Sequence, residues 1–214
     1  MSADLTTDIK PESTQVIEAG FNSSDGFALA QRVATALSKS TLIPKDYQNN
    51  LPNCLVALNM AQRLDADPLM VMQNLYVVHG RPAWSSQFLI ATANKSGKFS
   101  PLRYRFTGTK GKDDFGCVCS AVERETGEVL EGTEITIAMA KAEGWHSKNG
   151  SKWQTMPEQM LRYRAAAFFV RCYAPELSLG LSTREEVEDI VDGEVVSRSV
   201  GKLTMKKADE VQGE

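Results

Sequence analysis

The alternation of apolar and polar positions predicts several helices in the first half of the chain. Between about residues 26 and 38 an apolar side chain recurs every three or four positions, as on one face of a helix. Asn50 before Pro52 and Asp67 before Pro68 predict the starts of a second helix and a short third one, because Asn and Asp cap helices and proline fits the first turn. A strand is expected at 76–78, a turn over 79–82 and a further helix over about 85–95.

In the middle of the chain the spacing of apolar positions changes to every second residue, which predicts three strands at 102–107, 115–123 and 129–136. Turn residues at 108–114 and 125–128 join these strands into an antiparallel meander. A short helix is expected at 137–143, and a polar, glycine-containing loop follows it. Since helices precede and follow the meander, the predicted fold class is α+β, with an antiparallel sheet of three or more strands.

The last third of the chain carries signals for two helices. Thr155 is the expected N-cap of a long helix, with Pro157 in its first turn and Glu158 as the capping-box partner. The Thr-Arg-Glu-Glu run at 183–186 has the same signature and predicts a last acidic helix to about residue 191. The expected organisation is a flexible arm at 1–24, one domain at 25–192 and a disordered polar tail at 193–214.

Composition narrows the class of protein. The chain has 214 residues, of which 42% are hydrophobic, so one domain can bury a core. No apolar run is long enough to span a bilayer, and the polar N-terminus is not a secretory signal, so we expect no membrane partner. The four cysteines lack CxxC spacing and there are only two histidines, which favours buried thiols in a reduced intracellular protein over a metal site.

The net charge of −3 conceals a basic centre. Residues 1–78 carry 5 Lys/Arg and 8 Asp/Glu, residues 79–174 carry 14 and 9, and residues 175–214 carry 5 and 10. The three segments therefore have net charges of −3, +5 and −5, which sum to −3. A basic centre between acidic ends is compatible with a polyanion site in the middle of the chain.

The common catalytic motifs are missing. The chain has no GxxxxGK[ST] phosphate loop, no GxGxxG after a strand, no GxSxG and no HExxH. His79 and His146 lie in an expected turn and loop, and Asp113-Asp114 lies in a hairpin turn, where Asp is favoured for conformational reasons. We therefore expect neither an enzyme nor a bound metal or cofactor.

Basic residues alternate with aromatic ones instead. In a strand, Arg103 and Arg105 would share one face, with Tyr104 and Phe106 on the other. Lysine and arginine hold phosphates by charge, and aromatic rings stack on unpaired bases. The candidate DNA-contacting residues on these grounds are Arg103, Arg105, Lys110, Lys112, Lys148, Lys152, Trp153, Arg162, Arg164 and Arg171.

Arg164 and Arg171 stand out because their helix is otherwise apolar. They are seven residues apart and so point the same way. An unpaired buried charge is costly, so each needs an anion. That anion is either a carboxylate of the same protein or a phosphate of a ligand.

The last third of the chain contains the run W-Q-T-M-P-E-Q-M-L-R-Y-R at 153–164, which continues to Arg171, Gly180 and the helix at 183–190. This run is similar to the signature W-Q-x-x-P-x-x-M-L-R-x-K…A-R…G…E-A-E-R-I of Redβ. The chain resembles the RecT/Redβ family of phage single-strand annealing proteins between Cys54 and Asp192. The stretch 57–76 is similar to the family's helix and its entry into the sheet, and C-V-C at 117–119 is similar to a C-x-C of Redβ.

The resemblance implies a protein with a β-β-β-α core that binds single-stranded DNA and anneals complements without ATP. It implies rings or helical filaments of identical subunits, contact with the annealed duplex, and the cytoplasm of a bacterial host. It assigns DNA contacts to Arg164 and Arg171 and, across gaps, to Arg81 and Lys148. Glu158 departs from a basic family position and Gln73 lies near another, so Lys152 or Arg162 would replace those contacts. Redβ has a partner-binding domain where this chain has only a short tail, which weighs against contacts with a phage exonuclease or a host single-strand-binding protein.

Two other classes of protein stay open. A metal-dependent nuclease would need Asp113, Asp114 and further carboxylates to meet at one site. A structural or adaptor protein would pair the three helix arginines with Glu158, Glu176 and the acidic helix at 185–189.

Overall fold

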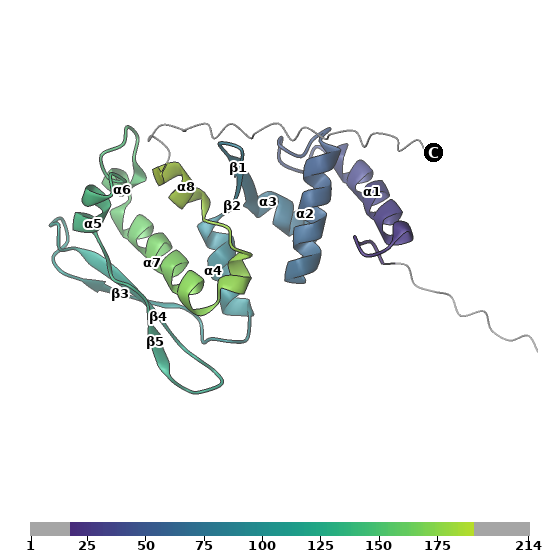
Figure 1. The fold of residues 1–214 in the computed structure, drawn as a ribbon. Helices are drawn as coiled ribbons and strands as arrows, with labels where there is room; N and C mark the ends of the chain where they lie inside the picture. The colour runs from purple at the N-terminus through teal and green to yellow at the C-terminus, as the bar shows by residue number, and fades with distance from the viewer. Residues whose placement is uncertain (1–17, 191–214) are drawn as a thin grey trace, which may run out of the picture.

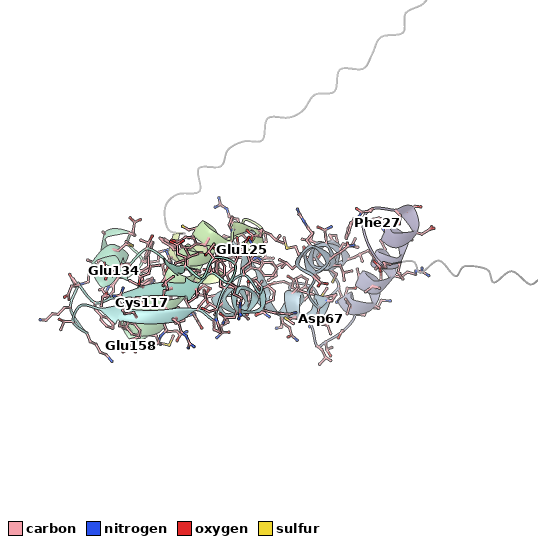
Figure 2. All side chains as sticks on the ribbon, turned by 90° about the horizontal axis from the view of Figure 1, so that it is seen from below. Phe27, Asp67, Cys117, Glu125, Glu134 and Glu158 are labelled. Atoms are coloured by element: carbon pink, nitrogen blue, oxygen red, sulfur yellow. The ribbon has the colours of Figure 1, made fainter. Side chains whose placement is uncertain are left out.

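Eight α-helices and two antiparallel sheets form the α+β fold of residues 18–190, which are the residues that the computed structural model describes. The elements follow one another along an elongated body, with α1 at one end and the larger sheet at the other (Figure 1). Figure 2 shows this body from below, with Phe27 and Asp67 towards one end and Cys117 and Glu158 towards the other. Most of the predicted arm and the whole predicted tail lie outside the described residues.

The second and third helices begin where their capping residues predict, and the first begins two residues before the expected start. α1 (Ser24–Ser38) starts after Ser23, whose hydroxyl accepts from the Gly26 amide. α2 (Leu51–Leu64) is capped by Asn50, and α3 (Pro68–Asn74) by Asp67, whose carboxylate accepts from two backbone amides. These helices enclose a first core that contains Tyr47, Val71, Met72 and Trp84.

A hairpin of β1 (Leu75–Val78) and β2 (Arg81–Trp84) covers this core. The turn is shorter than predicted, because His79 and Gly80 alone reverse the chain. Their φ angles are both positive, 50° and 76°, as a two-residue type I′ turn requires. The expectation that Arg81 belongs to the turn is therefore wrong, since it pairs with Val78 in the sheet.

The larger sheet follows α4 (Ser86–Lys95) and contains β3 (Arg103–Thr107), β4 (Gly116–Val122), β5 (Val129–Glu131) and β6 (Ile135–Thr136). The predicted third strand is split in two, and β5 and β6 pair with opposite ends of β4. At the break, a Cβ atom on Gly132 would lie 3.2 Å from the Cβ of Phe169. The side chain of Phe169 therefore packs closely against the backbone where the predicted strand is interrupted.

The C-terminal half contains α5 (Ile137–Ala142), α6 (Lys152–Thr155), α7 (Pro157–Tyr173), a 3₁₀ turn (Pro175–Ser178) and α8 (Arg184–Ile190). α7 lies along one face of the larger sheet (Figure 1). The side chains between these layers form a second core, which includes Cys117, Cys119, Ala165, Leu161 and Phe169.

The predicted cap of the long helix is wrong, and that of the last helix is confirmed. Thr155 ends the single turn of α6, so Met156 precedes α7 and no side chain caps it. Glu158 reaches Lys110 instead of the helix start. At α8, the Glu186 carboxylate accepts from the amide and the hydroxyl of Thr183 at 2.8 and 3.0 Å, as in a capping box.

The prediction of buried thiols is confirmed for Cys54, Cys117 and Cys119, whereas Cys172 is exposed. Burial raises the pKa of the Cys117 thiol to about 11 and that of Cys119 to about 12. These two groups are therefore protonated at neutral pH.

Candidate nucleic-acid interface

The structure contains a groove of about 840 Å³, which we call the basic groove. Its lining comes from β1, the start of α4, the β3–β4 loop, α6, the first turns of α7, and α8. Four cationic and two anionic side chains line it, so its charge is net positive. The charged and aromatic residues of the lining are Tyr76, Lys110, Lys152, Glu158, Arg162, Tyr163, Arg184 and Glu185.

Three of the predicted DNA-contacting residues line this groove, and we call this part of the lining the cationic side. Lys110 comes from the β3–β4 loop, Lys152 from α6 and Arg162 from α7. The Arg162 guanidinium lies over the Phe106 ring, 4.8 Å from its centroid, which fixes its position beside the sheet. Residues up to 52 positions apart in the sequence therefore contribute cations to one groove.

Glu158 lowers the charge of the cationic side without blocking it. Its carboxylate lies 2.6 Å from the Lys110 ammonium, and the hydrogen bond from Lys110 lowers the pKa of Glu158. The Lys110 side chain is 77% exposed, so solvent screens this pair. This exposed pair therefore contributes little to the stability of the fold.

A second part of the lining, which we call the stacked side, consists of Tyr76 on β1 and Arg184 on α8. The Arg184 guanidinium lies over the Tyr76 ring, 4.8 Å from its centroid. Its Nε donates to Glu188 at 2.6 Å, and this hydrogen bond raises the pKa of Arg184. Sequence reasoning missed both residues, because Arg184 stands in an acidic helix and Tyr76 in an apolar strand.

Tyr163 on α7 is a further aromatic lining residue that the sequence did not single out. Its hydroxyl accepts from the Gln87 amide at 3.0 Å. This hydrogen bond between two lining residues joins α7 to α4 at the groove.

Arg164 and Arg171 face α8 and not the groove. Arg164 pairs with Asp189, and its guanidinium lies 3.8 Å from the centroid of the Trp145 ring. The Arg171 guanidinium lies 2.5 Å from Glu186. We expected phosphates of DNA as the partners of Arg164 and Arg171. In the structure their partners are carboxylates of α8, as the hypothesis of a structural or adaptor protein predicts.

The Arg164–Asp189 pair is part of the interior. The two side chains are 3% and 10% exposed, and Asp189 also accepts from the indole of Trp153 at 2.8 Å. Burial lowers the pKa of Arg164 and raises that of Asp189, because desolvation disfavours both charges. Trp153 is also buried, so neither it nor Arg164 presents a surface to a ligand in this structure. Both residues instead hold α8, and with it the stacked side of the groove.

The remaining predicted residues do not line the basic groove. Arg103 and Arg105 are exposed on one face of β3, while Tyr104 and Phe106 pack on the other, as the alternation predicts. Arg105 lies 3.4 Å from Glu131. Exposed positions on β2 and in the β3–β4 loop hold Arg81 and Lys112, and the Lys148 ammonium donates to the Glu188 carbonyl at 2.9 Å.

The acidic residues that a nuclease would need are separated. Asp113 lies 2.5 Å from the Lys141 ammonium, and Asp114 accepts from the Thr109 amide within its own loop. Within residues 18–190, no three acidic, histidine or cysteine side chains gather as a metal-binding group. No helix in this part of the chain is long and apolar enough to cross a membrane.

Comparisons of the chain with protein-family models, with curated proteins and with solved structures found no match. The geometry of the basic groove and the sequence resemblance are therefore the two observations that bear on function.

Proposed function

We propose that this protein binds single-stranded DNA in the basic groove and anneals complementary strands without ATP. The observation that carries the proposal is that Lys110, Lys152 and Arg162 line one groove that also contains aromatic rings. Phosphate neutralisation by such cations supplies affinity that does not depend on base sequence. The RecT/Redβ resemblance supports the same function, with rings or filaments of identical subunits in a bacterial cytoplasm.

Annealing needs no catalytic group in this scheme. Base pairing supplies the free energy and the specificity, and the protein holds the strand so that its pairing edges stay open. The exposed Lys110–Glu158 pair can exchange its carboxylate for a phosphate as the strand enters. The separation of Asp113 and Asp114 from other acidic groups agrees with a binding role more than with metal-dependent cleavage.

The test is the salt dependence of strand binding by charge variants. Lys152→Gln and Arg162→Gln are each expected to weaken binding to any sequence and to flatten the plot of log affinity against log salt by about 0.7, the value for one lost phosphate contact on a single strand. Lys98→Gln is the matched control, since Lys98 is half-exposed, pairs with Glu176 and does not line the groove. An unchanged slope in both groove variants would remove the groove as the binding site.

The annealing step needs a separate measurement. Two complementary labelled oligonucleotides are mixed with the protein at low salt and without ATP, over a range of lengths. Pairing is expected to accelerate, and its failure to do so at every length would refute the annealing function.

A structural or adaptor role is the second candidate, and the pairing of Arg164 and Arg171 with α8 favours it. In that case both arginines serve only folding and the protein is indifferent to DNA. Failure of the wild-type protein to bind a single strand at low salt would select this role.

A further inference from the structure

We infer that Arg184, stacked on Tyr76, is a base-stacking platform that makes the basic groove select unpaired strands over duplex. This inference rests on the proposed function. It adds two residues with a role that phosphate binding does not supply.

The two sides of the groove differ in chemistry. The cationic side offers ammonium and guanidinium groups on flexible side chains, among them Lys110 with 77% exposure. The stacked side offers two planar groups, the Tyr76 ring and the Arg184 guanidinium, with a 4.8 Å separation between guanidinium carbon and ring centroid. A strand whose phosphates bind the cationic side has these planar groups within the same groove, where its bases can reach them.

The platform is held in place before any strand arrives. Glu188 fixes the Arg184 guanidinium through Nε, and the side chain is still 38% exposed. α8 itself is fixed, because Glu185 accepts from the Ser86 hydroxyl at 2.7 Å and Asp189 pairs with Arg164. A guanidinium plane oriented in this way stacks on the face of a base, and its preorganisation lowers the entropy lost on binding.

Stacking on a base face explains the selection of single strands. In duplex DNA the faces of the bases are covered by their neighbours, and unstacking a base-pair step costs free energy. An unpaired strand offers these faces freely. The Watson–Crick edges lie in the plane of the base, so a base held by its face can still pair with a complement.

The experiment compares two probes with the same number of phosphates: an oligothymidine, and an abasic strand of equal length. Tyr76→Leu and Arg184→Lys are each expected to weaken binding of the oligothymidine about 5- to 150-fold, the range for one base–aromatic stack. Both variants are expected to bind the abasic strand as the wild type does, with an unchanged salt slope. Tyr76→Phe keeps the ring and is expected to keep the affinity for both probes.

The outcomes separate the possible failures. Equal weakening for both probes, or a flatter salt slope in Arg184→Lys, would show a phosphate contact or a folding defect and would overturn the platform. Unchanged oligothymidine binding in both variants would overturn it as well. If the wild-type protein binds neither probe, the proposed function itself is wrong.

Discussion

The carboxylate of Asp189 is predicted to be among the most important polar groups for the stability of this fold. Asp189→Asn leaves the Arg164 guanidinium buried beside tryptophan rings without its ion-pair partner, while the asparagine oxygen can still accept from Trp153. Removing one partner of a buried ion pair costs about 3–5 kcal/mol. With a urea dependence of about 2 kcal/mol per molar, the unfolding midpoint is expected to fall by about 1.5–2.5 M.

The assay is equilibrium unfolding in urea, followed by tryptophan fluorescence and by circular dichroism. Glu176→Gln is the matched control, because it breaks an exposed ion pair with Lys98 worth about 0–1 kcal/mol. Adding Arg164→Met to Asp189→Asn removes the unpaired charge and is expected to restore most of the lost stability. The reasoning is refuted if Asp189→Asn shifts the midpoint no more than Glu176→Gln, or if the double variant is no more stable than the single one.

Three further predictions concern other parts of the fold. Gly108→Ala is expected to destabilise the protein by more than 1 kcal/mol in urea unfolding, because Gly108 has a φ of 64° and its Cβ would lie 2.1 Å from the Asp114 carbonyl oxygen; a stable variant would contradict this geometry. One thiol per chain, Cys172, is expected to react rapidly with an aromatic disulfide reagent at pH 8, and the other three only on unfolding; several fast thiols would show an open core. Thr183→Ala is expected to lower the free energy of unfolding by about 1–2 kcal/mol, because the capping hydrogen bond to Glu186 is lost. Thermal unfolding measures this, and an unchanged melting temperature would show that the cap does not stabilise the fold.

Local signals in the sequence predicted most elements, because they depend on neighbours along the chain. Asn50 and Asp67 cap helices where expected, since their side chains bond amides two or three residues away. Thr155 misled because Ser151 begins an earlier turn, and a helix one turn long carries no periodicity from which to predict it. The break at Gly132 was equally invisible, since it depends on the approach of Phe169 from a distant helix.

The candidate site was harder to predict than the fold. Sequence reasoning showed that Arg164 needs an anion but could not decide between a ligand and Asp189, because the partner is fixed only by tertiary packing. The same limit applies to Tyr76 and Arg184, which are 108 positions apart in the sequence and lie in contact at the groove. The cationic side was foreseen residue by residue, but its assembly at one groove was not.

The buried ion pair that holds α8 affects how a bound strand would move along the groove. Ions in solution screen exposed charges within about 10 Å at 0.1 M salt but act weakly on buried pairs such as Arg164–Asp189. Added salt should therefore weaken the contact of Lys110 with the DNA backbone, whereas α8, which carries Arg184, stays packed against β1. A strand held mainly by one stacked base could then slip along the groove one nucleotide at a time without leaving it, and so search for the register in which its complement pairs.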